Sequence, residues 1–279
     1  MKKNYLSKLL VAVFVVVLTA VPALAGGLPK PASKNPEAQK LIDKAWALDR
    51  ADSTAETHKQ CISLMEQADK LDPNNPSILT EISRYYWNHG DVLPKDTPEQ
   101  KKKLEQIYAK GIAAAEKSLK VKETVAGHYW LAVNKAASNE FNSIFAQAAA
   151  FPSIYSHSQY VRKNDPGYYY GADGRLWSEI IARVPKRVVE IVGTKFVKEA
   201  SDDIDSAIKI EPRYLDNYTY KARFLYVYFG KKEEALKLCD YVLKQNPNIF
   251  PEEVTANKSA QKGARILWKR ITGKEYPQK

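Results

Sequence analysis

The sequence has little of what catalytic and metal sites are made from. Its 279 residues include only two cysteines and four histidines. The histidines stand at no spacing that would put two of them on one helical face as a metal pair; they are His58, His89, His128 and His157. No serine or cysteine matches a local nucleophile motif. These absences predict a protein that is not an enzyme and that needs no metal or cofactor.

Patterns typical of β-strands are also missing. Apolar residues recur at spacings of three and four, which is the period of an amphipathic helix, and do not alternate. A glycine loop of the nucleotide-binding kind needs a strand before it, so such a loop has no place here. The sequence therefore predicts an all-α fold.

The two cysteines could form one disulfide, but their positions argue against it. Cys61 lies among apolar residues of the first helix pair and Cys239 among those of the last. A disulfide needs Cα atoms within about 7 Å of each other, and we expect the ends of a helical solenoid to lie far apart. Both cysteines are predicted to be small core residues.

A long apolar run occurs only at the start of the chain. The apolar run 9–20 follows a basic start that contains Lys2, Lys3 and Lys8. Small residues that end at Ala25, just before Gly26, form a candidate cleavage site. This pattern predicts a secretory signal peptide, residues 1–25, cleaved after Ala25. The run is shorter than the ~20 residues of a spanning helix, so no stable membrane insertion is expected. No cysteine follows for lipid attachment, and we predict a periplasmic protein.

Positive charge exceeds negative charge, with 43 Lys and Arg against 32 Asp and Glu, or +11. Without the three lysines of the leader the formal charge is +8. The basic residues form no dense run beyond Lys101 to Lys103, so we interpret them as a solvated surface and exclude nucleic acid as a partner. An acidic protein or an anionic ligand stays open as a partner.

The most regular stretch of the chain, Tyr214–Pro247, predicts two helices joined by a turn. Tyr218, Ala222 and Leu225 recur at spacings of four and three, which places them on one helical face. Gly230 can turn the chain after the first helix without a Cβ penalty. The second helix should end before the closing proline.

The last six residues of this stretch have relatives upstream, which indicates a repeat. They end at Pro73, Glu123, Pro166, Pro212 and Pro247, so successive units are 35 to 50 residues apart. A tetratricopeptide repeat has a period of about 34 residues, and the longer units are that period plus an insertion. We predict an α-solenoid of about five tetratricopeptide-like helix pairs over residues 36–272. An extended leader, 26–35, precedes it, its last helix, 252–271, caps it, and a tail, 273–279, follows.

Several features depart from a regular repeat. Thr97 is predicted to cap a long helix to Lys120, and Thr194 the helix that ends at Ile210. Pro152 should kink the run 140–160 or divide it into two helices. The glycine-rich and tyrosine-rich segment 165–175 is predicted to be a loop, followed by a short helix at 175–182.

The first helices of such pairs line the concave surface of a solenoid, so their spare residues are candidates for binding. A groove with exposed aromatics, an asparagine and an arginine would suit a peptide, the flank of a protein or an amphipathic small molecule. Trp130 is also well suited to the core, and the segment with Tyr169 could either cradle a ligand or cover a helix pair. The predicted binding residues are Arg84, Trp87, Trp130, Asn134, Tyr169, Arg175, Tyr220, Phe224 and Tyr228.

Three segments together resemble one family. They are Gly127 to Asn134, reading GHYWLAVN; the loop Asp165 to Gly171 with Arg175 and Leu176 after it; and Gly193-Thr194 leading to Ala200. They resemble the T component of some tripartite ATP-independent periplasmic (TRAP) transporters, the TatT family, over about Pro76 to Pro247. The most specific of these segments is GHYWLAVN, since repeats alone are common to many families.

The resemblance implies an all-helical periplasmic protein that forms a homotrimer around a pore-like path and docks a periplasmic solute-binding protein. Many members are lipoproteins, whereas no cysteine stands near the cleavage point here. The function expected from the sequence is a non-enzymatic scaffold for solute uptake, which could also bind or channel an amphipathic ligand. The alternative is a general periplasmic repeat protein that organises envelope assembly complexes.

Overall fold

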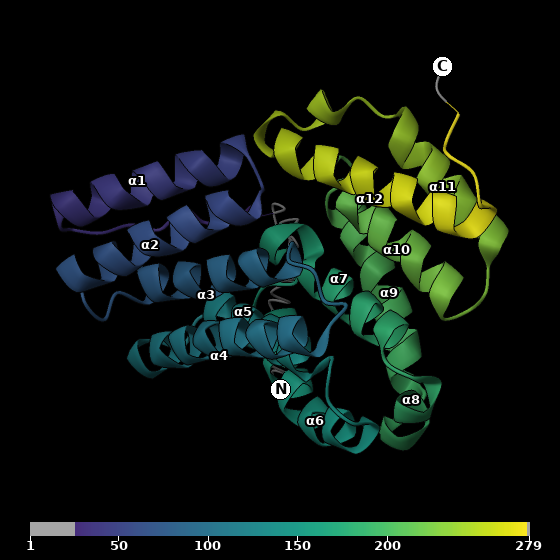
Figure 1. Ribbon diagram of the computed structural model, residues 1–279, viewed down its shortest axis with the longest axis horizontal. Helices are drawn as coiled ribbons and strands as arrows, with labels where there is room; N and C mark the ends of the chain where they lie inside the picture. Colours follow the sequence, from purple (N-terminus) through teal and green to yellow (C-terminus); the bar gives the residue numbers. More distant parts are fainter. Residues whose placement is uncertain (1–25, 278–279) are drawn as a thin grey trace, which may run out of the picture.

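The structure is a computed structural model that describes residues 26–277. The predicted signal peptide and the last two residues lie outside this range. Within it all regular structure is helical, with twelve α-helices and two short 3-10 helices, so the all-α prediction is confirmed (Figure 1). None of the helices in residues 26–277 combines the length and apolar character needed to cross a membrane.

The first half of the chain forms six helices with well-defined starts. Asn35 and Asn75 cap helices with side-chain acceptors, and each precedes a proline at the first helical position. Thr97 and Gln100 form a capping box, so the predicted cap at Thr97 is confirmed. The helices are α1 (Pro36–Ala51), α2 (Ala55–Leu71), α3 (Pro76–Asp91), α4 (Pro98–Val121), α5 (Val125–Asn139) and α6 (Ile144–Asn164).

Helix α6 runs unbroken through Pro152, so the prediction of two shorter helices was wrong. Proline removes one intrahelical hydrogen bond, but tertiary packing outweighs that loss here. Phe151 and Ile154, on either side of the proline, are buried in two different core clusters. The neighbouring helices therefore hold α6 together across the proline.

The second half is less regular than a repeat would be. Thr194 stands at the start of α9, but its side chain makes no capping hydrogen bond, which corrects that prediction. The terminal helix begins two residues later than predicted. The helices are α7 (Tyr168–Arg183), α8 (Lys186–Val192), α9 (Lys195–Ile210), α10 (Asp216–Val227), α11 (Lys232–Lys244) and α12 (Val254–Thr272), with η1 (Pro247–Ile249) and η2 (Pro251–Glu253) before α12.

The helices stack in two halves. In the first half α1 packs on α2, α2 on α3, α3 on α4, α4 on α5 and α5 on α6, as expected for successive pairs. In the second half α7 packs on α9 and α10, α10 on α11, and α12 covers α10 and α11. Helix α6 contacts α7 through buried side chains: Ser158 Oγ donates to Asp173 and accepts from Nε1 of Trp177. Helix α6 also packs on α8, so it joins the two halves.

The two ends of the stack meet, contrary to the expectation that a solenoid keeps them apart. Arg50, at the end of α1, donates to the carbonyl of Glu252 at 2.8 Å and forms an ion pair with Glu253 at 2.8 Å. Thr255 Oγ1 donates to the carbonyl of Arg50 at 2.7 Å. In Figure 1 the end of α1 lies beside the start of α12. Cys61 and Cys239 are free thiols, each buried in a different core cluster.

A left-handed turn opens α7, where the sequence predicts a loop. Tyr169, Tyr170 and Gly171 have φ angles of 43°, 57° and 77°. The predicted loop is shorter than 165–175: Tyr169 to Gly171 lie outside right-handed helical geometry, whereas the helix expected at 175–182 is part of the longer α7. Left-handed geometry costs a non-glycine residue roughly 1–2 kcal/mol, so neighbouring contacts must hold this turn.

A substitution at Gly171 can measure how tightly the turn is packed. A Cβ on Gly171 would lie 2.6 Å from the Cα of Ala207 in α9, whereas a Cβ on Gly230, which also has positive φ, would meet nothing within 4 Å. We expect Gly171→Ala to lower the free energy of unfolding by about 3 kcal/mol, since strain and a backbone clash add. The control, Gly230→Ala, should cost about 1 kcal/mol. Equal losses in urea denaturation would contradict this packing.

Candidate functional site

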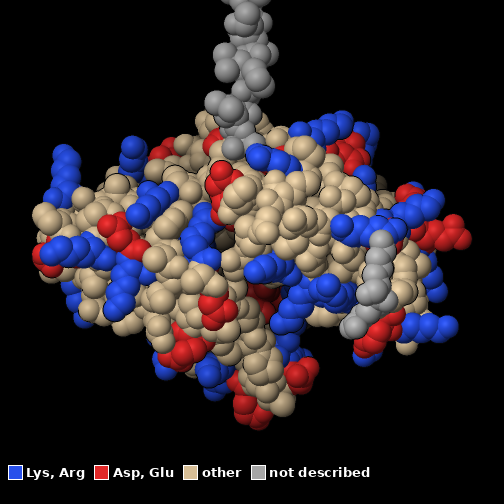
Figure 2. Space-filling view, turned by 90° about the horizontal axis from the view of Figure 1, so that it is seen from above, with Lys and Arg blue, Asp and Glu red and all other residues tan. Residues whose placement is uncertain are grey.

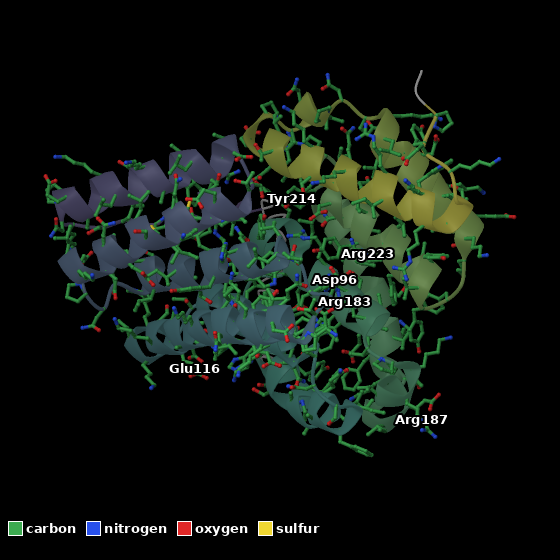
Figure 3. All side chains as sticks on the ribbon, viewed as in Figure 1. Asp96, Glu116, Arg183, Arg187, Tyr214 and Arg223 are labelled. Atoms are coloured by element: carbon green, nitrogen blue, oxygen red, sulfur yellow. The ribbon has the colours of Figure 1, made fainter. Side chains whose placement is uncertain are left out.

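A cavity of about 180 Å³ lies where the two halves of the molecule meet. Its walls come from α3, α4, α5 and α6 on one side and from α7, α8 and α10 on the other. Figure 3 shows two lining residues, Arg183 and Tyr214, in the middle of the molecule, while Glu116 and Arg187 lie toward its edges. A cavity of about 150 Å³ can take a molecule as large as benzene, so this one has room for a small organic ligand.

Aromatic side chains from both halves form a continuous wall of the cavity. Trp87 of α3 lies 5.8 Å from Trp130 of α5, measured between ring centroids, and Trp130 lies 6.4 Å from Tyr169. Tyr169 in turn lies 5.8 Å from Tyr214 at an edge-to-face angle. Tyr220 of α10 extends the lining. Trp87, Tyr169 and Tyr220 are only half-buried, so their rings keep surface that a ligand can contact.

Part of this wall comes from α5, in which every residue from Gly127 to Asn134 is buried. Trp130 is 2% exposed and donates from Nε1 to the hydroxyl of Tyr168 at 3.1 Å. Trp130 therefore belongs both to the core and to the cavity wall.

Arg175 holds the left-handed turn in place from inside α7. Its guanidinium donates to the carbonyls of Tyr169 and Tyr170 at 2.6 and 3.1 Å and to Oδ1 of Asn217 at 2.7 Å. The same group lies 4.8 Å from the ring centroids of both Tyr169 and Tyr214. Arg175 is 4% exposed, so it positions the aromatic wall and is not a free cation.

Ion pairs join the two halves at the more exposed side of the cavity. Glu140, at the end of α5, pairs with Lys95 at 2.8 Å and with Arg183 of α7 at 3.0 Å. Arg183 and Arg223 both bind Oε1 of Glu179 at 2.5 Å. Burial raises the pKa of Glu179, but the two arginines outweigh burial and hold this pKa below its usual value. Its other oxygen, Oε2, is buried without a hydrogen-bond partner among the described residues.

Two further carboxylates line the cavity without a partner. The side chains of Asp91, the last residue of α3, and Asp216, the first residue of α10, make no hydrogen bond or ion pair with another described residue. Asp216 is half-buried, and burial raises its pKa, to which the negative charge of Glu179 adds; Asp91 is exposed. For Asp216, Arg175 and Arg223 oppose the shift without cancelling it, and its pKa is about 6.

Five of the nine binding residues predicted from the sequence line this cavity. They are Trp87, Trp130, Tyr169, Arg175 and Tyr220. They come from four helices, α3, α5, α7 and α10, and the closed arrangement of the halves brings them together. The other four, Arg84, Asn134, Phe224 and Tyr228, are not among the lining residues.

Arg84 and Asn134 stabilise helix packing outside the cavity. Arg84 is 3% exposed and pairs with Asp49 at 2.9 Å and with Glu81 at 2.7 Å. Asn134 is fully buried and donates to the carbonyls of Ser83 and Trp130 at 3.1 and 2.9 Å. Their partners are part of the fold, so we do not assign them to a binding site.

Phe224 and Tyr228 belong to the core of the second half. Phe224 is 1% exposed in a cluster with Trp177 and Ile181, and Tyr228 packs against that cluster. Lys186 lies over the ring of Tyr228 at 5.5 Å. The sequence places Tyr220, Phe224 and Tyr228 on one helical face, but only Tyr220 lies near enough to the first half to reach the cavity.

Of the charged lining residues, only Arg175 was predicted from the sequence. Asp91, Glu179, Arg183 and Asp216 stand at helix ends or on a helix whose neighbours are apolar, and no motif marks them. One local signal was available, since Glu179 lies between Trp177 and Ile180 in a strongly apolar stretch. A carboxylate in such surroundings needs a partner or a function.

Comparisons with known proteins assign no function to this site. No protein-family model matches the chain, and no curated protein matches it significantly. In residues 26–277 no group of three or more histidine, cysteine, aspartate or glutamate side chains is placed to hold a metal ion.

Arg175 gives a direct test of how the aromatic wall is held. We expect Arg175→Met to lower the free energy of unfolding by about 3 kcal/mol or more, because two buried carbonyls and Asn217 lose a charged donor. Its near-ultraviolet circular dichroism should also change, since Tyr169 and Tyr214 lose the group that fixes them. The control is Arg187→Met on exposed α8, which should stay within about 0.5 kcal/mol of wild type. A wild-type spectrum for Arg175→Met would contradict the positioning role.

Proposed function

We propose that this protein is a non-enzymatic scaffold of the solute-uptake type that holds a small ligand in its central cavity and docks a periplasmic solute-binding protein. The observation that carries the proposal is the aromatic cavity between the two halves of a helical-repeat fold. Pockets of this kind, mostly apolar with a few convergent polar groups, are typical of ligand-binding sites. The resemblance to the TatT family supports the same reading and supplies the expected partner.

The route into the cavity follows from the exposure of its lining. Asp91 is exposed, and the side chains of Glu140 and Arg183 are 26% and 34% exposed. These three residues come from the ends of α3, α5 and α7, whereas Trp130 and Tyr214 on the opposite wall are almost fully buried. The cavity therefore opens to solvent beside the ion pairs that join the two halves.

Two exposed apolar side chains form a candidate docking surface for a protein partner. Phe145 at the start of α6 and Ile191 near the end of α8 are 78% and 60% exposed, and α6 and α8 pack on each other. The exposed apolar side chains of α6 and α8 suit a protein partner. On the face that Figure 2 shows, Lys and Arg are interspersed with Asp and Glu and form no single basic patch that would suit a polyanion.

A cavity-filling variant tests the ligand part of the proposal. Ala136 of α5 lines the cavity and is half-buried, so Ala136→Trp should fill much of the space. We expect native mass spectrometry of protein purified from the periplasm to show a bound small molecule that this variant lacks. Ala113→Trp, which adds the same volume on the exposed face of α4, is the control. No bound molecule in the wild type, or an equal amount in Ala136→Trp, would count against the proposal.

Crosslinking in intact cells tests the docking part. We expect Phe145→Asp to reduce capture of a solute-binding protein, because a charge on an exposed apolar contact opposes burial. Phe145 is 78% exposed, so the fold should be unaffected. Recovery of envelope assembly factors, with no solute-binding protein, would favour the alternative function.

A further inference from the structure

The charges of the cavity wall indicate the chemical class of the ligand, which the proposed function leaves open. Four carboxylates line the cavity, against two arginines. Each of the two arginines is already bound by groups of the protein. Arg183 pairs with Glu140 and Glu179, and Arg175 is held by two carbonyls and Asn217. No lining cation is therefore left for an anionic ligand.

The acceptors of the cavity, by contrast, are incompletely used. Asp91 and Asp216 make no ion pair with any described residue, and Glu179 keeps one buried oxygen without a partner. Asp91 is exposed to solvent, whereas Asp216 is half-buried and Oε2 of Glu179 is buried. A charged group that is buried without a partner is costly. Asp91, Asp216 and Oε2 of Glu179 thus line one space, and no donor of the described residues binds them.

The aromatic wall fits the same kind of ligand. A cation within about 6 Å of the face of a tryptophan or tyrosine ring is attracted by the quadrupole of the ring, and cages of such rings bind quaternary ammonium groups. Trp87, Tyr169 and Tyr220 line the cavity with surface still accessible. The rings can surround the apolar part of a cation while the carboxylates balance its charge.

We infer that the cavity binds a small organic cation, an amine or a quaternary ammonium compound, with Asp91 and Asp216 as its charge partners. The inference rests on the proposed function only in that the cavity takes a ligand. It assigns the chemical class of that ligand, which neither the repeat pattern nor the family resemblance provides.

Matched pairs of probes separate charge from shape. Isothermal titration calorimetry at neutral pH would compare choline with its neutral carbon isostere, dimethylbutanol, and phenethylamine with phenethyl alcohol. In at least one pair we expect the cation to bind tenfold or more tightly than the neutral molecule. Asp216→Asn and Asp91→Asn should each weaken binding of that cation about tenfold, and the double variant should bind both members of the pair equally.

The control variant is Glu116→Gln on α4, which makes the same change of charge at a half-exposed side chain far from the cavity (Figure 3). It should bind like the wild type. Thermal melts would confirm that each variant is folded before titration. Equal affinity for both members of both pairs would overturn the inference, as would variants at Asp91 and Asp216 that bind like Glu116→Gln.

The pH dependence of choline binding supplies a second readout, because choline keeps its charge at every pH. Affinity should fall as the pH drops from 7 to 5, since Asp216, whose pKa is raised to about 6, takes up a proton. The charged and titratable groups around it are Arg175 and Glu179 of α7, Asp91 of α3, Tyr129 of α5, and Tyr214, Tyr220 and Arg223. Asp216→Asn should flatten most of this dependence, and an unchanged slope would contradict the assignment.

The outcomes distinguish this inference from the proposed function. If only the neutral molecules bind tightly, and Ala136→Trp abolishes that binding, the cavity binds a ligand but the inference of a cation is wrong. Binding of none of the four probes, together with no bound molecule in native mass spectrometry, would reject both.

Discussion

The guanidinium of Arg175 is the contact on which the centre of this molecule depends. Three successive residues adopt left-handed geometry at the start of α7, and two of them are tyrosines that carry a steric cost there. Arg175 binds the carbonyls of both tyrosines and packs against the rings of Tyr169 and Tyr214. One buried side chain therefore fixes a strained backbone and one wall of the cavity at the same time.

The helical stack closes on itself and encloses an interior. Contacts from Arg50 to Glu252 and Glu253 bring its two ends together. The backbone amide of Tyr170 also donates to Gly26 at 3.2 Å, which ties the extended leader to the same turn. Because both halves contribute walls, the cavity exists only while they stay in contact.

The helices could be predicted from the sequence because their signals are local. Apolar residues three and four apart identify α1 to α5, α10 and α11. Proline and asparagine mark the starts of some of these helices, such as α1 and α3. The turn at Tyr169 could not be predicted, since its stability comes from Arg175, Asn217 and the close approach of Ala207. Trp87 and Tyr220 were identified as binding residues from helix faces, whereas Asp91 and Asp216 depend on how the halves meet and carry no local signal.

The most direct test of this account is a crystal structure of residues 26–277 grown with an organic cation that binds in solution. The account predicts a closed molecule with the cation against the rings of Trp87 and Tyr220 and its charged group beside Asp91 or Asp216. An open stack with Arg50 apart from Glu253, or a closed one with only water between the aromatic walls, would contradict it.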